Sequence, residues 1–547
     1  MGGKDMKNGI FCLMALFVWQ ACSVEDKGNY EYNPLNGVTV TFAKEEENQI
    51  VEKGLDTLKI SPTIAGDIYG ENEENYEYTW FFCSGKDHEH TVVGNKKNLE
   101  WPASFKPGNY TLYLQVDDKS TGLQWIKSTG VRVFSELTQG WMLLGETADR
   151  EVRLDMLVQK PDTIVLIENI FDNSQLHLKG ARDLIFTGNR STKEHIAHLW
   201  LMTDEKDMKM TWGNNFLPVG EFHQMLTVEE MEVSRETPRI RDMFPRQNSS
   251  YGPTTTMRCV SNRGIVTDNA IYMTIVGSDG SEIYVNPMNR YLNSKDFFKP
   301  YPMAFVLGGT RYSGNVYPLF YDMDAECFVK PGQPYGSSAT YCQKLADKQG
   351  DPFPWNQYKR TIVYGENLRN NSSDYFCNCV ALMKDTEGED INYYIYVFRP
   401  GAKGYMAAAP INNPTKVAGY TIDKTVAVDF DKATHYTFMS NAAVLLYTVG
   451  STLYAYNYTY KTLASMDMGS EISYIGADVV LNKAYFWMGT YDGQKGELKI
   501  MQLSGNTTPE LSHAEDACWP LNMKLTDVEW KYGEDPAEEE PEEGEGQ

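Results

Sequence analysis

The chain has 547 residues, 42% of them hydrophobic, so it is long and apolar enough for two or more domains with buried cores. Its formal net charge of −24 argues against a nucleic-acid-binding protein, because binding to phosphates requires a basic surface. The same charge disfavours electrostatic docking on anionic lipid.

The first residues have the pattern of a secretory leader. Lys4 and Lys7 precede an apolar run that is too short to cross a bilayer as a helix. The run leads into Trp19-Gln20-Ala21-Cys22, which resembles a bacterial lipobox. We therefore expect residues 1–21 to be a lipoprotein signal peptide. Cys22 would become the acylated residue that attaches the mature protein to the lipid bilayer.

The residues that follow this cysteine indicate a location. Glu25-Asp26 resembles the surface-export signal of Bacteroidota lipoproteins, although Val24 and Lys27 depart from it. The expected location is the outer membrane, with the protein facing the cell exterior. Residues 22–37 would form a tether to the lipid. An ordinary secretory leader with a chance cysteine stays the alternative.

Residues 38–136 show the pattern of a β-sandwich. Short runs with a period of two are separated by turns rich in Gly, Pro and Asn. The runs cover residues 38–42, 57–60, 76–82, 110–116 and 129–134.

Two of these runs resemble strands of PKD-type immunoglobulin-like domains. Tyr78-Thr79-Trp80-Phe81-Phe82 is similar to the central tryptophan strand, and residues 107–118 are similar to the penultimate strand. The glycine-rich turn that usually follows the tryptophan strand is replaced by Cys83-Ser84-Gly85-Lys86, so the resemblance is to a divergent, PKD-like branch. It implies that Trp80 packs between two sheets.

Residues 140–532 are expected to form a β-propeller, which makes the predicted fold class all-β. Strand–turn–strand pairs recur roughly every 56 residues, a spacing that fits seven four-stranded blades and leaves six or eight open. We expect the strand at residues 525–532 to pair with the first propeller strand near Trp141, because a ring must close to remove its edges. The pairs cover residues 141–158, 198–212, 270–288, 316–330, 392–409, 444–466 and 484–503.

The acidic end of the chain, residues 533–547, is rich in Pro, Gly and Glu. It has too little apolar surface to offset the entropy of ordering, so we expect it to be disordered.

No motif in the sequence indicates catalysis or a metal. A Gly-x-Ser-x-Gly elbow, an HExxH pattern, a P-loop and an EF-hand loop are all missing. His88-Glu89-His90 offers two metal ligands, but no third ligand is evident. The 74 acidic residues make any carboxylate pair for glycoside hydrolysis uninformative. We therefore predict no catalytic residue, no metal, no cofactor and no enzymatic activity. The seven cysteines besides Cys12 and Cys22 lack regular spacing, so their pairing stays open.

Aromatic residues are abundant, at 13% of the chain. Exposed Tyr and Trp rings stack on the apolar faces of sugars, so aromatic residues in the loops are candidates for a ligand-binding platform. The alternative is that strands favour aromatics and that blades pack on them. The candidates, which include residues of the long connection 333–358, are Tyr251, Tyr312, Tyr335, Tyr341, Trp355 and Tyr358.

As a whole, the chain resembles PKD-like family lipoproteins encoded in polysaccharide-utilisation-type loci of Bacteroidota. The resemblance implies a surface lipoprotein that binds a glycan or a polypeptide without enzymatic activity. It also implies a TonB-dependent transporter and a capture lipoprotein as partners. A glycan hydrolase or lyase of the propeller type, and a structural subunit of a transporter complex, stay as alternatives.

Overall fold

The computed structural model divides into two compact units, unit 1 (Met1–Phe134) and unit 2 (Ser135–Gln547). The predicted signal peptide, Cys22, most of the tether and the acidic tail lie outside the residues that the structure describes. Within the described residues, no helix is both long and apolar enough to span a membrane. The described residues are 35–53, 56–84, 89–105, 108–134, 137, 140–159, 164–171, 173–187, 198–210, 216, 218–227, 238–244, 262–275, 283–285, 287–306, 318–332, 340–357, 359–368, 378–400, 413–477 and 484–531.

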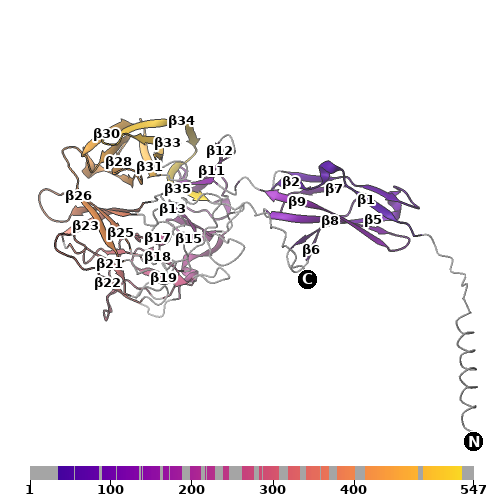
Figure 1. The fold of residues 1–547 in the computed structure, drawn as a ribbon, viewed down its shortest axis with the longest axis horizontal. Helices are drawn as coiled ribbons and strands as arrows, with labels where there is room; N and C mark the ends of the chain where they lie inside the picture. The colour runs from indigo at the N-terminus through magenta and orange to yellow at the C-terminus, as the bar shows by residue number, and fades with distance from the viewer. Residues whose placement is uncertain are drawn as a thin grey trace, which may run out of the picture. The chain divides into compact units, whose positions relative to one another are not determined.

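Unit 1 is a β-sandwich (Figure 1). One sheet has five strands, β2 (Gln49–Glu52), β9 (Gln124–Phe134), β8 (Gly108–Asp118), β5 (Tyr76–Ser84) and β6 (Glu89–Gly94), in that order. The pair β2 and β9 is parallel, and the other neighbours are antiparallel. Two further pairs are β1 (Val38–Thr41) with β4 (Thr63–Gly66) and β3 (Thr57–Ile60) with β7 (Leu99–Pro102).

Trp80 lies at the centre of the unit 1 core, as the resemblance implied. Its side chain is fully buried, and its indole Nε1 donates a hydrogen bond to the Lys96 carbonyl at 2.9 Å. The Phe42 ring lies 5.9 Å from the Trp80 ring. Buried residues from all three sheets share this single core, which is the packing that defines a sandwich.

Unit 2 consists of antiparallel sheets of three or four strands, and seven such sheets occur in its described residues. This arrangement confirms an all-β fold with propeller-like blades, while the number of blades in the whole chain stays a prediction. The sheets are β12 (Ile164–Ile167), β11 (Val152–Gln159), β10 (Gly140–Glu146) and β35 (Lys524–Lys531); β13 (Ala181–Thr187), β14 (His198–Thr203), β15 (Asp207–Met210) and β16 (Pro218–Glu221); β17 (Ile240–Phe244), β18 (Asn262–Thr267) and β19 (Ile271–Ile275); β20 (Phe320–Asp322), β21 (Cys327–Pro331) and β22 (Cys342–Lys344); β23 (Arg360–Asn367), β24 (Cys379–Asp385), β25 (Tyr393–Arg399) and β26 (Thr415–Thr421); β27 (His435–Phe438), β28 (Val444–Val449), β29 (Thr452–Asn457) and β30 (Thr462–Asp467); and β31 (Glu471–Ala477), β32 (Tyr485–Tyr491), β33 (Gly496–Ser504) and β34 (Glu510–Leu521).

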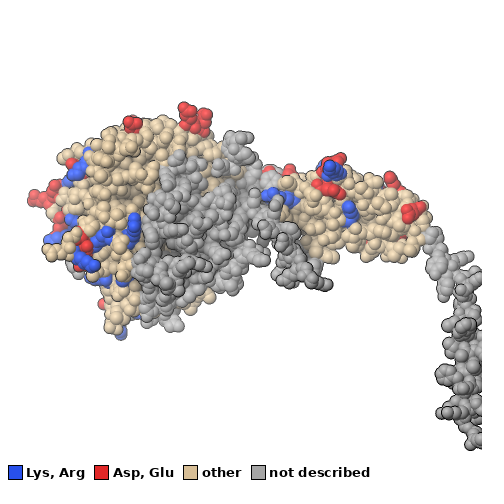
Figure 2. Space-filling view, in the orientation of Figure 1, with Lys and Arg blue, Asp and Glu red and all other residues tan. Residues whose placement is uncertain are grey.

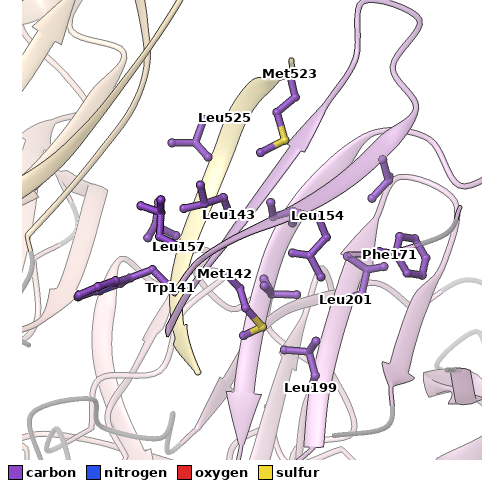
Figure 3. Packing of buried hydrophobic residues seen from close by; sticks show 14 of the residues in the cluster. Trp141, Met142, Leu143, Leu154, Leu157, Phe171, Leu199, Leu201, Met523 and Leu525 are labelled. Carbon is purple, nitrogen blue, oxygen red and sulfur yellow. The ribbon is translucent and has the colours of Figure 1, made fainter. Parts of the chain in front are cut away.

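The last strand of the described chain completes the first sheet of unit 2. Strand β35 pairs with β10 in antiparallel fashion, with Trp530 opposite Trp141. The predicted closure is therefore confirmed. Figure 3 shows Leu525 and Met523 on this side of the sheet, close to Leu143 and above the packed side chains of β10 and β11. Burial of these apolar groups supplies the driving force for closure.

Polar side chains join neighbouring sheets of unit 2. Four of them accept a hydrogen bond from a backbone N–H group on an edge strand of a neighbouring sheet, and the other two accept from Ala304 and Val306, on either side of the isolated bridge between Phe305 and Leu319. We call these contacts the seams. They provide acceptors for backbone N–H groups that have no partner in a strand ladder. The seam acceptors are Asp527 for Leu184 N–H (2.9 Å), Asp207 for Ile240 N–H (2.7 Å), Asp242 for Ala304 N–H (2.8 Å), Asn367 for Val306 N–H (3.1 Å), Glu366 for Phe438 N–H (2.7 Å) and Thr437 for Ala477 N–H (3.2 Å).

The predicted strand pair at residues 270–288 forms only in part within the described residues. Its first run forms β19, but Tyr284 in the second run makes an isolated parallel bridge to Leu226. The second run still lies beside β19, because the Thr274 hydroxyl donates to the Ile283 carbonyl at 2.6 Å and the Met288 N–H donates to the Ile271 carbonyl at 2.9 Å. The second run therefore contacts both β19 and Leu226, without a regular strand ladder to β19.

Candidate ligand-binding site

Tyr341 stands at the start of β22, beside the end of β21. Lys330 pairs with Gln343 in the register of these strands, and the Gly332 N–H donates to the Tyr341 carbonyl at 2.9 Å. Since side chains alternate along a strand, Lys330, Tyr341 and Gln343 lie on the same face as Gly332. We call these four residues the Tyr341 platform.

The Tyr341 ring rests on Gly332. A Cβ atom at Gly332 would lie 1.9 Å from Tyr341 Cε2 and 2.4 Å from both Cδ2 and Cζ. A point 1.9 Å outward from Cε2 in the ring plane would lie about 2.9 Å from both of its neighbours, so the distances of 2.4 Å place the Cβ position above the ring. One face of the ring therefore covers the glycine backbone. The side chain is half-buried, so part of it is exposed to solvent.

Arg290 lies beside this region. The Arg290 carbonyl accepts the Cys342 N–H at 2.7 Å, and the Arg290 Nε donates to the Thr340 carbonyl at 3.2 Å, so Arg290 is fixed to both neighbours of Tyr341. The Lys344 ammonium lies 5.4 Å from the centroid of the Tyr291 ring, and the alternation of side chains along β22 places Lys344 on the opposite face from Tyr341. Over the part of unit 2 where β21 and β22 lie in Figure 1, Figure 2 shows Lys and Arg side chains interspersed with Asp and Glu.

The connection between β22 and β23 is fixed by one buried lysine. The Lys416 Nζ, on β26, lies 2.6 Å from both an Asp347 and an Asp351 carboxylate oxygen, and its side chain is 5% exposed. The hydrogen bond from Lys416 lowers the pKa of Asp351 below its ordinary value. Burial alone would raise the pKa of Asp347, but hydrogen bonds from Lys416 and the Trp355 N–H lower it.

Trp355, a predicted platform residue, belongs to the hydrophobic core. It is 4% exposed and its ring lies 5.2 Å from those of Phe328 and Phe353. A ring that is this deeply buried packs between two sheets and offers no open face to a sugar. The other predicted residues, Tyr251, Tyr312, Tyr335 and Tyr358, lie outside the described part of the chain. Their proposed role in binding stays a prediction.

The sequence named Tyr341 as a candidate, a role that stays a prediction, but it did not indicate the residues that surround Tyr341 in the structure. The pairing of β21 with β22 brings Gly332, Lys330 and Gln343 onto one face with Tyr341. The only local sign of this arrangement in the sequence is the alternation of residue types along each strand. Arg290 was missed because its contact with Thr340 joins residues 50 positions apart.

The carboxylates at the seams have a structural task. Oxygen atoms of Asp527, Asp207, Asp242 and Glu366 accept backbone N–H groups of the neighbouring sheet. A carboxylate engaged in this way is held in place and stays in a fixed hydrogen-bonded geometry. These residues therefore stabilise the ring of sheets, whatever chemistry other carboxylates could perform.

Several of the described histidines and cysteines pack against neighbouring side chains or form hydrogen bonds. The His90 ring stacks on Phe81, with the ring centroids 4.5 Å apart, while His88 lies outside the described residues. Cys327 and Cys342 are buried free thiols, and Cys518 is an exposed one whose Sγ donates to a Glu497 carboxylate oxygen at 2.9 Å. In the described chain, no group of three His, Cys, Asp or Glu side chains is arranged to hold a metal.

Residues 22–178 match the model of the PKD-like family. The match spans the sandwich and continues into the first strands of unit 2, so it confirms the resemblance for this part of the chain. Among curated proteins, no match to the chain is found.

Three bacterial proteins are among the solved structures to which the chain is similar. A quinoprotein alcohol dehydrogenase-like protein from Bacteroides thetaiotaomicron is 9% identical, with a TM-score of 0.33, over 89% of this chain and 99% of that one. A periplasmic gluconolactonase from Pseudomonas aeruginosa is 8% identical, with a TM-score of 0.35, over 72% of this chain and 98% of that one. A protein of a mixed-linkage glucan utilization locus of Bacteroides ovatus, solved with a mixed-linkage heptasaccharide, is 11% identical, with a TM-score of 0.17, over 91% of this chain and 100% of that one. The fold assignment here rests on strand pairing and on the family match.

Proposed function

We propose that the protein is a non-enzymatic surface lipoprotein that binds a glycan through the Tyr341 platform. The observation that carries this proposal is the position of the Tyr341 ring, one face of which rests on Gly332. An aromatic ring held flat by the backbone can stack on the apolar face of a sugar without losing side-chain freedom on binding. Gln343 and Lys330, on the same face, supply hydrogen-bond donors for sugar hydroxyls.

The absence of enzymatic activity is part of the proposal. The seam carboxylates are occupied by backbone N–H groups, so none of them is a ready acid or nucleophile. A hydrolase or lyase would need two further carboxylates that face each other across a cleft.

We also propose a location and partners. Acylation of Cys22 would hold the protein at the outer membrane, with unit 1 as a spacer, near a TonB-dependent transporter and its capture lipoprotein. This part rests on the sequence of the leader. Metabolic labelling with radioactive palmitate, compared between the native chain and a Cys22→Ser variant, tests it. Label in the native chain alone supports it, and label in neither overturns it.

Titration calorimetry of the chain from Ser23 onward, against a panel of glycans and peptides, tests ligand binding. We expect at least one glycan to bind, and Tyr341→Ala to weaken that binding at least tenfold, because stacking on one ring contributes on the order of 1–1.5 kcal/mol beyond burial. Tyr460→Ala is the matched control, since Tyr460 is a tyrosine 59% exposed at the turn between β29 and β30. Equal losses in both variants, or binding of peptides alone, would contradict the proposal.

A further inference from the structure

The Tyr341 platform contains a lysine in an unusual setting. Lys330 is half-buried on the face that carries the Tyr341 ring, one residue pair away along the β21–β22 ladder. Within the described chain, no carboxylate lies within ion-pair distance of its ammonium group. Diagonal neighbours on one face of a sheet lie within reach of long side chains. A cation is thus placed at the rim of an aromatic surface.

Two carboxylates of the β20–β21 hairpin have other partners. Asp322 is 1% exposed and accepts hydrogen bonds from the Tyr291 hydroxyl and from the Asp324 and Ala325 N–H groups. Asp324 in turn accepts the Lys299 N–H at 2.8 Å. These contacts hold both carboxylates at the hairpin end of β21, which is the opposite end from Gly332 and Tyr341.

The negative charge of the whole chain would make the Lys330 position selective for anionic ligands. With a net charge of −24, most of the surface repels an anionic polymer, and only a region that carries cations can accept one. Arg290, fixed beside Thr340, adds positive charge next to the start of β22. A neutral sugar would use the hydrogen-bond donors of these groups but would gain nothing from their charge.

We propose that the ligand of the Tyr341 platform is an anionic glycan. One of its rings stacks on Tyr341, and the carboxylate or sulfate of the same or the adjacent ring forms a charge-assisted hydrogen bond with Lys330. Arg290 attracts the following anionic residues of the chain. This inference rests on the proposed function and adds the chemical class of the ligand.

Matched pairs of oligosaccharides test the inference. An oligogalacturonate is compared with its methyl ester, and a sulfated galactan oligosaccharide with its desulfated form, each by titration calorimetry against the chain from Ser23 onward. We expect one charged member to bind about tenfold more tightly than its neutral partner, as a partly exposed charge-assisted hydrogen bond allows. The excess should shrink as salt is raised from about 50 to about 300 mM, because exposed charges are screened more strongly at higher ionic strength.

Three variants separate charge from stacking. Lys330→Gln keeps a hydrogen-bond donor but loses the charge, so it should remove the tenfold excess of the charged over the neutral member. Lys359→Gln, at an exposed lysine paired with Glu387, should leave that excess intact. Gly332→Ala should weaken both members alike, because the new methyl group occupies the place of the Tyr341 ring. Circular dichroism confirms that each variant is folded.

The outcomes are distinguishable. Equal affinity for charged and neutral members, or an excess that persists in Lys330→Gln, overturns the anionic inference and leaves glycan binding intact. If no charged or neutral glycan binds, the proposed function fails and this inference fails with it.

Discussion

Replacing Lys416 with methionine should destabilise unit 2 more than any exposed lysine could. The Lys416 ammonium is 2.6 Å from Asp347 and 2.6 Å from Asp351, and it lies 5.3 Å from the centroid of the Trp355 ring. Methionine retains the apolar stem but leaves two carboxylates without a cation. Breaking a buried pair costs about 3–5 kcal/mol. The carboxylates are 32% and 27% exposed, so water can replace part of the loss, and we expect about 2–3 kcal/mol.

Urea unfolding, followed by near-ultraviolet circular dichroism, measures this loss as a change in the free energy of unfolding of unit 2. The matched control is Lys359→Met, because the Lys359–Glu387 pair has an N–O distance of 2.9 Å but side chains that are 68% and 64% exposed. An exposed pair of this kind contributes about 0–1 kcal/mol.

A double variant sharpens the test. If the cost comes from unpaired carboxylates, Asp351→Asn should recover part of the stability lost in Lys416→Met, although it destabilises the native protein. Equal losses in Lys416→Met and Lys359→Met, or no recovery in the double variant, would refute the reasoning that a buried lysine holds the β22–β23 connection in place.

Three further predictions follow from the described contacts. Burial and the hydrogen bond to Glu497 raise the pKa of Cys518 to about 11, so at pH 8 its thiolate is on the order of 100-fold scarcer than in an ordinary cysteine. Alkylation of Cys518, followed by peptide mass spectrometry, should be slow at pH 8 and accelerate up to pH 11, and Glu497→Gln should hasten it; fast reaction at pH 8 would contradict this. Glu366→Ala should cost about 1–3 kcal/mol in urea unfolding, because the Phe438 N–H loses its acceptor, while Glu366→Gln retains an acceptor oxygen and should cost less; the reverse order would speak against the seams. A chain that stops at Met523 lacks β35, so limited proteolysis should degrade unit 2 and spare unit 1, whereas a resistant unit 2 would show that closure is dispensable.

The parts of the fold that could be predicted depend on local patterns. Alternating residues around Trp80 identify a buried central strand because period two and a large aromatic are both visible in a few positions. The β28–β29 hairpin follows from two β-rich runs joined by Gly450-Ser451. Closure by β35 follows from the general need of a ring to remove its edges, not from any residue that marks the partner.

The parts that could not be predicted depend on distant partners. Tyr341 and Trp355 lie in the same Gly- and Pro-rich stretch and have similar sequence surroundings, yet one is half-exposed and the other buried. The difference arises because Lys416, 69 positions from Asp347, draws the connection onto β26. In the same way, Tyr284 forms a bridge with Leu226, and the local alternation of residue types cannot indicate a partner that is so distant in the sequence.

The closing strand also sets the order in which unit 2 can fold. The N-terminal end of a chain emerges first, at roughly 5–20 residues per second during synthesis. Strand β10 cannot pair with β35 until almost the entire remaining length has emerged, because Trp141 lies opposite Trp530. Until then the first sheet of unit 2 has an open edge next to apolar residues. Synthesis would thus expose a transient, adhesive intermediate whose lifetime is set by delivery of the final segment.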